Sequence, residues 1–341
     1  MKYWSYSRSR LFKNCPRAYY YRYLLRNSDE AHRARVLGNL TTLQMAAGGA
    51  VDFVISRTLA AWRDKGELKT DLDEVGERLI RRIIAESPHT VDAMRNCDQD
   101  APKYDRHLPP LASDFYNIDL GAEFTERMVT RVMQCLHTFE QGEIWERLRG
   151  FGCSTWGPLV QVDLERMPFF TLNRCIRVSA AYDFALKLDS TVHIVDWKAG
   201  LHSERALRDA SDQLTVYGLW AAAEYRVPIE TVRTQAVWLS EGAPIWNPQP
   251  LNPDLASETV DRIQQEVAEE QTRLIPVRNP DSNVVSYEVD PSAYPPNPST
   301  SRCLECPFRK LCPAGQVECA HVSTPRASRT TPDKLLTQSS R

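Results

Sequence analysis

Hydrophobic residues recur with two different periods in the second half of the chain. Residues 174–188 and 191–198 are rich in branched and aromatic side chains, and the Asp-Ser pair at 189–190 suits the turn of a β-hairpin between them. Residues 203–225 then have the spacing of a helix, and residues 231–239 again have the composition of a strand. A strand, a crossing helix and a second strand predict a parallel pair with a right-handed connection.

The first half of the chain is predicted to be mostly helical. Three segments repeat apolar residues at helical spacing: 51–65, 73–87 and 122–141. The N-terminal stretch also favours helices, with Ser7 capping one helix and Pro16 opening the next. A last helix is predicted over residues 255–273.

The composition limits the kinds of protein and the domain organisation that this chain can have. The chain has 341 residues, 42% of them hydrophobic, which suffices for a substantial core. No stretch approaches the ~18 uninterrupted apolar residues of a membrane span, and the start has no apolar signal core, so we expect a cytoplasmic protein without membrane contact. The pattern divides the chain into five parts: N-terminal helices at 1–50, a helical insertion at 51–150, an α/β core at 151–245, a C-terminal segment at 246–320 and a disordered polar tail at 321–341.

Two aspartates and a lysine share one face of the predicted hairpin. With residues 189–190 at the tip, Asp183 lies opposite Asp196, and their Cβ atoms are expected about 5 Å apart. Lys198 lies two residues beyond Asp196, so the period of two in a strand places it on the same face. Trp197 then points the other way, into a core.

This arrangement of charges favours a metal site. Like charges opposite each other destabilise a sheet, and a hard cation such as Mg²⁺ or Mn²⁺ compensates for two carboxylates. A divalent ion activates water and clamps a phosphate, while a neighbouring lysine stabilises charge that develops on phosphorus. The pattern is therefore typical of metal-assisted phosphodiester hydrolysis. The alternative is a solvated hairpin face that carries one Asp–Lys pair.

Four of the nine cysteines have a metal-binding pattern. Cys303, Cys306 and Cys312 lie close together, and Cys15 lies far upstream. Zinc sites usually join two close cysteine pairs, whereas one pair, a third cysteine and a remote fourth fit a four-thiolate iron–sulfur cluster better. Zinc is the alternative metal, and Cys319 is a substitute ligand. The isolated cysteines are predicted to be buried thiols: Cys97, Cys135, Cys153 and Cys175.

The N-terminal stretch combines basic and aromatic residues. Residues 1–35 hold nine Lys or Arg, including Arg17, against two acidic residues. Tyrosines are interleaved with these charges: Tyr19, Tyr20, Tyr21 and Tyr23. Such a mixture suits single-stranded nucleic acid, because cations follow the backbone and rings stack on bases, and Arg17 is a candidate DNA contact. The alternative is a solvated helical face whose tyrosines pack inward.

These motifs resemble the PD-(D/E)XK nuclease superfamily, specifically its RecB-like branch with a C-terminal iron–sulfur cluster. That branch has an Asp at the end of one strand, an Asp or Glu followed by x-Lys on the next, and a helix with QxxxY. The matching residues here are Asp183, Asp196, Lys198, Gln213 and Tyr217. The resemblance implies a restriction-endonuclease-like α/β fold with a mixed central sheet flanked by helices. It also implies that Gln213 and Tyr217 support DNA and the active site.

The resemblance further implies two kinds of cofactor. Asp183 and Asp196 would hold Mg²⁺ or Mn²⁺. A [4Fe–4S] cluster would be held by the N-terminal cysteine and three C-terminal ones: Cys15, Cys303, Cys306 and Cys312. Such a cluster would staple the two ends of the chain into one module, a closure that chain entropy otherwise disfavours.

The chain departs from this branch at one position. Relatives usually carry a metal-binding His in a GxxxH phrase, but here Gly48 is followed four residues later by Asp52. Asp52 is a candidate oxygen ligand in place of the imidazole. The branch also often has an acidic residue on the strand before the first motif Asp, for which Asp163 and Glu165 are both candidates.

Taken with the resemblance, these residues predict a metal-dependent deoxyribonuclease, most simply an exonuclease on single-stranded DNA or free DNA ends. The resemblance places it in DNA repair, CRISPR adaptation or antiviral defence, with a helicase or a CRISPR adaptation protein as candidate partners. An alternative is a catalytically weak iron–sulfur subunit that binds DNA or scaffolds a larger nuclease complex. A redox sensor is a third hypothesis, but it leaves the hairpin carboxylates unexplained.

Overall fold

The computed structural model describes residues 2–66, 71–95, 104–105, 107–163, 167–242, 244–278 and 285–320. The predicted tail at 321–341 therefore lies outside the described residues, as do Cys97 and Glu165.

The described residues form thirteen α-helices and nine strands, with a π-helical turn at Tyr20–Leu24 and short 3₁₀ turns between them. The helices are α1 (Tyr6–Asn14), α2 (Pro16–Tyr19), α3 (Asp29–Leu37), α4 (Leu43–Lys65), α5 (Leu72–Arg95), α6 (Ala112–Phe115), α7 (Ala122–Gln141), α8 (Glu143–Gly150), α9 (Val160–Asp163), α10 (Glu204–Tyr225), α11 (Pro253–Thr272), α12 (Thr300–Glu305) and α13 (Pro313–Cys319). The strands are β1 (Lys2–Ser5), β2 (Phe169–Leu172), β3 (Ile176–Ser179), β4 (Phe184–Leu188), β5 (Thr191–Lys198), β6 (Val232–Trp238), β7 (Gln249–Pro250), β8 (Leu274–Arg278) and β9 (Val285–Val289).

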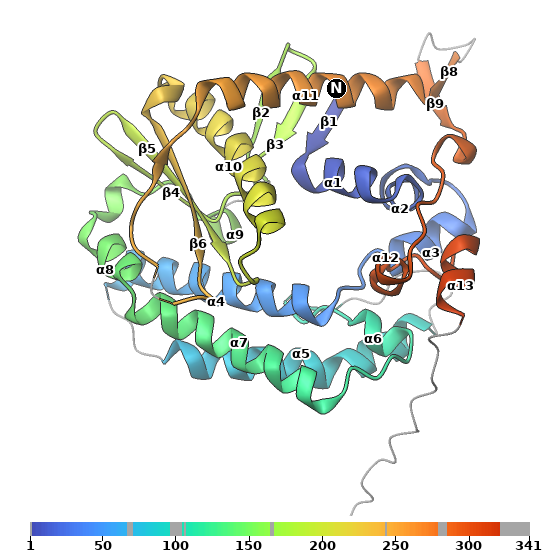
Figure 1. Cartoon of the computed structure of the whole chain (residues 1–341), viewed down its shortest axis with the longest axis horizontal. Coiled ribbons are helices and arrows are strands. Elements are labelled where there is room, and N and C mark those ends of the chain that lie inside the picture. Colours follow the sequence, from blue (N-terminus) through green and yellow to red (C-terminus); the bar gives the residue numbers. More distant parts are fainter. Residues whose placement is uncertain are drawn as a thin grey trace, which may run out of the picture.

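The predicted hairpin and crossover are confirmed. Strands β4 and β5 are antiparallel, Leu188 pairs with Thr191, and Asp189 at the tip has a left-handed backbone (φ 53°). Helix α10 then returns the chain so that β6 pairs parallel to β5, in a mixed sheet of order β4-β5-β6-β7. Ser203 caps α10 by accepting a hydrogen bond from the Ala206 amide. Figure 1 shows α10 crossing one face of this sheet.

The prediction of one continuous strand over 174–188 is wrong. Residues 180–183 leave the extended ladder, and β3 instead belongs to a second sheet of order β1-β3-β2. The physical reason is tertiary: Tyr182 is 1% exposed, stacks on Trp220 of α10 with ring centroids 4.4 Å apart, and donates a hydrogen bond to the Pro158 carbonyl (3.1 Å). The chain leaves the strand conformation here, and Tyr182 occupies this interior position.

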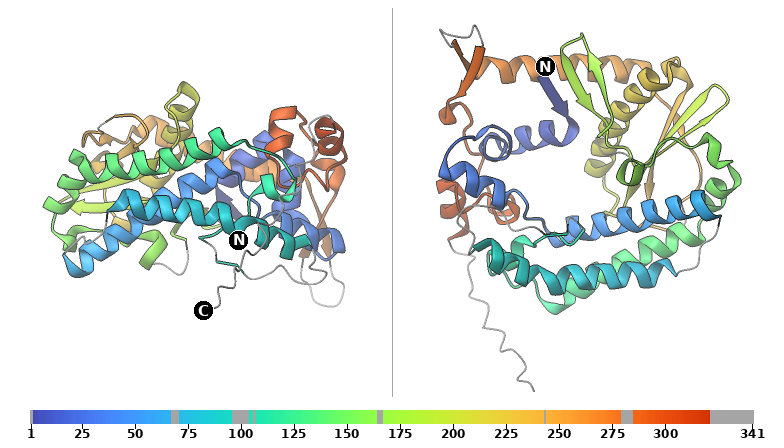
Figure 2. Two further views of the ribbon diagram at one scale, coloured as in Figure 1. Left: turned by 90° about the horizontal axis from the view of Figure 1, so that it is seen from below. Right: turned by 180° about the vertical axis from the view of Figure 1, so that it is seen from behind.

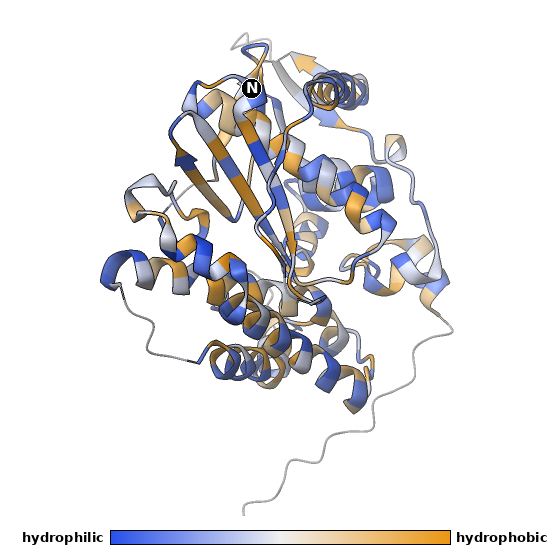
Figure 3. Ribbon diagram, turned by 60° about the vertical axis from the view of Figure 1, so that its left-hand side comes forward, coloured by the Kyte–Doolittle hydropathy of each residue, from blue (hydrophilic) through white to orange (hydrophobic). Residues whose placement is uncertain are grey.

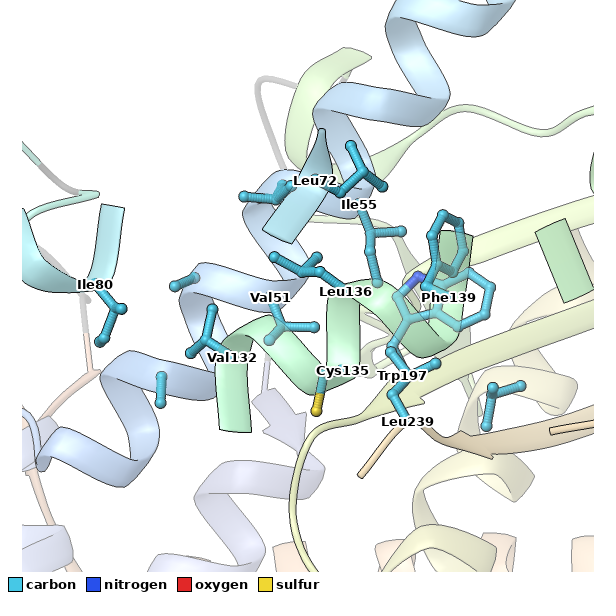
Figure 4. Packing of buried hydrophobic residues seen from close by; sticks show 14 of the residues in the cluster. Val51, Ile55, Leu72, Ile80, Val132, Cys135, Leu136, Phe139, Trp197 and Leu239 are labelled. Atoms are coloured by element: carbon cyan, nitrogen blue, oxygen red, sulfur yellow. The ribbon is translucent and has the colours of Figure 1, made fainter. Parts of the chain in front are cut away.

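Helices α4, α5 and α7 pack together beneath the mixed sheet (Figure 1). Figure 4 shows Val51 and Ile55 of α4, with Leu136 and Phe139 of α7, lying near Trp197 of β5. Trp197 thus points into a core, away from the face of Lys198, as predicted. Helix α4 ends at Gly66 in the left-handed conformation (φ 69°), a frequent way to terminate a helix. The hydropathy view in Figure 3 shows apolar residues frequent along the strands and mixed with polar ones on the helices.

The N-terminal helices and the last helices of the described chain lie side by side. The N-terminal helices α1–α3 and the C-terminal α12–α13 meet at one end of the molecule, as both Figure 1 and Figure 2 show. The Tyr21 hydroxyl donates to the Leu311 carbonyl (2.9 Å), and Arg302 donates to the Asn14 carbonyl (3.1 Å). The cap of α1 is Ser5 rather than the predicted Ser7, because the Ser5 hydroxyl accepts from the amide three residues on.

Candidate active site

Asp196 and Lys198 lie at the carboxyl end of β5, and Asp183 directly precedes β4. Phe184 pairs with Val195, so continuing the ladder by one residue sets Asp183 opposite Asp196, as the hairpin register predicts. Asp196 is only 3% exposed. The Lys198 ammonium forms an ion pair with the Asp196 carboxylate. The two aspartates and the lysine are therefore brought together at the end of adjacent strands.

A backbone amide orients the first aspartate. The N–H of Trp197 donates to Asp183 Oδ2 at 2.7 Å. The side chain of Trp197 is packed in the core below the sheet, so this amide is a rigid donor. Hydrogen bonds from backbone amides fix a carboxylate in one orientation and favour its charged form.

Lysine, glutamine and tyrosine form a hydrogen-bonded chain above the sheet. Lys198 Nζ donates to Gln213 Oε1 at 2.6 Å, and Gln213 Nε2 donates to the Tyr217 hydroxyl at 2.5 Å. Gln213 and Tyr217 are four residues apart on α10, so one helical face presents both. Tyr217 is 4% exposed. The helix thereby fixes the position of the Lys198 ammonium.

Asp52 joins the same site from helix α4. Its carboxylate interacts electrostatically with Asp196 and Lys198 and accepts a hydrogen bond from the Ser56 hydroxyl (3.5 Å). The side-chain amide of Gln161, on α9, also donates to it. Three carboxylates, one on α4, one just before β4 and one on β5, therefore interact around a single lysine.

Burial and mutual repulsion raise the pKa values of these carboxyl groups. Desolvation and the charge of Asp196 raise the pKa of Asp52 to about 7. Desolvation, followed by Asp196 and Asp52, raises the pKa of Asp183 well above its ordinary value, and desolvation also raises the pKa of Asp196. Asp196 is buried and the other two are half-buried, and desolvated carboxylates that repel one another favour either protons or a cation. Their oxygen atoms are ligands that suit Mg²⁺ or Mn²⁺.

The structure places two predicted residues elsewhere. Asp163, a candidate strand carboxylate, lies on helix α9 rather than on a strand, and it is engaged by the Arg63 guanidinium (2.5 and 2.9 Å). Arg17 lies beside the cysteines, where its guanidinium is 5.7 Å from the ring centroid of Tyr20. The structure thus brings neither residue to the carboxylates.

Two residues that contact Asp52 were not found from the sequence. Ser56 is four residues beyond Asp52 on the same helix, so helical spacing could have pointed to it once Asp52 was a candidate. Gln161 offers no such signal, because its contact with Asp52 depends on how the short helix α9 packs against α4.

Four cysteines line a separate cavity of about 410 Å³, between the N-terminal helices and α12–α13: Cys15, Cys303, Cys306 and Cys312. Burial raises the pKa of Cys303, and it raises that of Cys306 to about 12. Cys319 is also buried, but it is not among the described residues that line this cavity. Of the isolated cysteines, Cys135 is buried as predicted, Cys153 is partly buried, and the prediction is wrong for Cys175, which is exposed.

The distances between the four cysteine sulfur atoms can be compared with those of a compact metal site. In the described part of the chain, one group of three or more metal-ligating side chains has its ligand atoms within 4.8 Å of one another, and it consists of Asp71, Asp73 and Glu140. The cysteines are therefore spaced more widely. Four sulfur atoms on a tetrahedral zinc ion, with Zn–S bonds of about 2.3 Å, would lie about 3.8 Å apart. Asp52, Asp183 and Asp196 do not meet this limit either, so at both sites at least one pair of ligand atoms lies more than 4.8 Å apart.

The acidic triad of Asp71, Asp73 and Glu140 is a separate feature, at the start of α5 and the end of α7.

The N-terminal tyrosines are mostly structural: Tyr19, Tyr20 and Tyr21 are 3–6% exposed. Their burial leaves these three rings no free face for a nucleobase, so the inward-packed alternative is correct for them.

An α/β fold that gathers carboxylates and a lysine at the ends of adjacent strands is typical of metal-dependent phosphodiester hydrolases. The family model of the PD-(D/E)XK nuclease superfamily matches residues 3–313, and the chain belongs to this superfamily. Its members use divalent metals. No curated protein matches the chain at a significant level. Among the described residues, no helix is both long and apolar enough to cross a bilayer.

Proposed function

We propose that this protein is a metal-dependent DNA nuclease of the RecB-like branch, acting as an exonuclease on single-stranded DNA or free ends. The observation that carries the proposal is the convergence of Asp52, Asp183 and Asp196 around Lys198. Asp183 and Asp196, with Asp52 as third ligand, hold the divalent ion. The proposed setting is DNA repair, CRISPR adaptation or antiviral defence, inside the cell and beside a helicase or adaptation protein.

When bound, Mg²⁺ or Mn²⁺ would lower the pKa of a water molecule and neutralise charge on the phosphate. Lys198 supplies a fixed positive charge, because Asp196 and Gln213 hold its ammonium from two sides. An ammonium held in this way can orient the attacking water or stabilise the charge that develops on phosphorus. Burial, with the charges of Asp196 and Asp183, raises the pKa of Tyr217 well above its ordinary value, so Tyr217 acts as a neutral hydrogen-bonding group.

We also propose that the four cysteines hold a [4Fe–4S] cluster. Their convergence on one cavity, with one close pair, a third cysteine and a remote fourth, supports this assignment. The cluster is a structural group, since the cavity joins the two ends of the chain and lies apart from the carboxylates. Arg17, at the same cavity, is positioned to contact a DNA backbone that passes this end of the molecule.

Cleavage of DNA by anaerobically purified protein tests the nuclease proposal. The substrates are an end-labelled linear single strand and a covalently closed single-stranded circle, each with Mg²⁺ or Mn²⁺. We expect loss of the linear strand only, reduced at least about 100-fold by Asp196→Asn. The matched control is Asp189→Asn, the same exchange at the exposed hairpin tip, where Asn tolerates the left-handed backbone.

Two other outcomes would change the proposal. Cleavage of the circle as well would make the protein an endonuclease. Binding of DNA that is unaffected by Asp196→Asn, with no cleavage by the wild type, would favour a catalytically weak subunit that binds DNA or scaffolds a larger complex. The replacement of the usual histidine by Asp52 is the feature that favours this second candidate.

A further inference from the structure

A cavity of about 850 Å³ lies beside the proposed active site, on the α10 side of the mixed sheet. Register connects the two: Asp196 pairs with Ala236, and Lys198 pairs with Trp238, so the side chains of each pair share a face. Ala236 and Trp238 both line the cavity. Neighbouring strands are about 4.8 Å apart, so the edge of the cavity lies one strand away from Asp196 and Lys198.

The lining of this cavity suits a flat, neutral group. Trp238 is partly exposed, and His202 contacts it in a T-shaped arrangement with ring centroids 5.1 Å apart. Apolar side chains of α10, including Leu207 and Leu214, form the opposite wall. The described lining contains no Lys or Arg, and Glu241 is its one acidic residue. A phosphate would find no cation here, whereas an aromatic base would find a stacking surface.

Polar neutral groups complete the lining. Asn247, Gln249 and Asn252 line one side of the cavity. Gln249 Nε2 donates to Asn247 Oδ1 (2.8 Å), and Asn252 Oδ1 caps α11 by accepting from the amides of Asp254 and Leu255. The side-chain amide nitrogens of Asn247 and Asn252 and the Gln249 Oε1 atom are therefore the groups that can meet the edge of a nucleobase. The volume also lies within the range of about 300–1,000 Å³ that is common for small-molecule sites.

The rim beside Trp238 is held in place by hydrogen bonds. The His202 amide donates to Glu241 Oε1 (2.5 Å), and the Ser240 hydroxyl donates to the Gly200 carbonyl (2.6 Å). These bonds tie the loop that follows β5 to the loop that follows β6. The aromatic pair therefore belongs to a preformed wall, which lowers the cost of ordering it on binding.

We propose that this cavity is a nucleobase subsite, in which an unpaired base next to the cleaved phosphate stacks on Trp238. The inference rests on the proposed nuclease function and deepens it, because it names the subsite and the side chain that would select unpaired DNA. A base can enter the cavity only from a single strand or after leaving a duplex. Stacking on an aromatic ring tolerates any base, so the subsite selects unpaired DNA without selecting a sequence.

Equilibrium binding tests the subsite without relying on cleavage. The probes are a fluorescent single-stranded oligonucleotide and a chain of equal length built from abasic nucleotides, measured by anisotropy without added divalent metal. Trp238→Ala should weaken binding of the normal oligonucleotide about 5- to 100-fold and leave binding of the abasic chain unchanged. Trp238→Phe should restore most of the affinity. The matched control is Tyr287→Ala, which removes a 54%-exposed ring on the distant strand β9.

The outcomes separate this inference from the proposed function. Equal losses for both probes, or no loss for the normal oligonucleotide, would overturn the subsite even if the protein cleaves DNA. A base-dependent loss in a protein that cleaves nothing would support the subsite and remove the nuclease proposal. Retention of abasic binding by Trp238→Ala also shows that the variant is folded, so a misfolded variant cannot be mistaken for a positive result.

Discussion

At the scale of single residues, three carboxylates interact with one another beside a single lysine. Each is fixed by a different kind of donor: a backbone amide for Asp183, an ammonium for Asp196, and a hydroxyl and an amide side chain for Asp52. Desolvation and repulsion among them raise their pKa values, which shows that the metal-free arrangement carries an electrostatic cost. A divalent ion bound between the carboxylates would remove this repulsion, and the free energy released would strengthen its binding.

Exchange of Asp52 for the histidine of the GxxxH pattern should change the metal preference. An imidazole nitrogen suits transition metals better than Mg²⁺, so in Asp52→His the ratio of Mn²⁺- to Mg²⁺-supported cleavage should rise about tenfold. Asp52→Ala should lower cleavage at least about tenfold with either ion. Initial rates over a metal titration measure both effects. The control is Asp64→His on the same helix, where the carboxylate is 58% exposed; an unchanged ratio in Asp52→His would exclude Asp52 as a ligand.

The raised pKa of Asp52 also predicts a pH-dependent stability. With a pKa of about 7 in the folded chain and about 4 in the unfolded chain, Asp52 binds a proton only when folded between these pH values. The folded state therefore loses stability as the pH rises through this window. In chelator, the thermal unfolding midpoint should fall from about pH 5 to about pH 7, and Asp52→Asn should flatten the slope. Added Mg²⁺ should raise the midpoint most at the higher pH; identical slopes with and without Asp52 would contradict this.

At the scale of elements, the β4–β5 hairpin decides whether Asp183 and Asp196 meet. A slip of one residue would turn one of the two carboxylates to the opposite face of the sheet. The tip holds the register, because Asp189 adopts the left-handed backbone that a tight turn requires. The active site thus depends on a turn that lies several residues from it.

Substitution at this tip should change stability in a predictable direction. Valine is costly in the left-handed region, so Asp189→Val should lower the free energy of unfolding by about 1–2 kcal/mol. Asp189→Gly, which accepts that conformation freely, should leave stability unchanged or slightly raised. Urea unfolding curves of the two variants measure the difference. Equal stability of the valine and glycine variants would mean that the turn does not constrain the hairpin.

The hairpin also shows which parts of the site the sequence could predict. The period of two fixes the faces of Asp196, Trp197 and Lys198 as soon as the tip is known, and a helical spacing of four pairs Gln213 with Tyr217. The break after β3 was missed, because it depends on the packing of Tyr182 against a helix about forty residues further along the chain. Gln161 was missed for the same reason: local patterns carry no information about which distant elements touch.

At the scale of the whole molecule, the cysteine cavity joins the first helices to the last. Cys15 lies between α1 and α2, whereas the other three cysteines lie in or between α12 and α13. Hydrogen bonds such as that from Tyr21 to Leu311 also cross this junction, but a cluster would add covalent closure. A cross-link between positions this far apart removes more entropy from the unfolded chain than one across a short loop.

Removal of the single N-terminal ligand therefore tests the closure. Cys15→Ser leaves the three C-terminal thiols in place, so it should release the closed loop and lower the content from about four iron atoms per chain. By the loop-closure entropy of a cross-link across nearly the whole chain, the free energy of unfolding should fall by roughly 5 kcal/mol. Iron analysis, visible absorbance and urea unfolding of anaerobic protein measure these changes. Cys175→Ser, at an exposed isolated cysteine, is the control and should retain full iron. Zinc in place of iron in the wild type would refute the cluster, and wild-type stability in Cys15→Ser would show that side-chain packing alone joins the two ends.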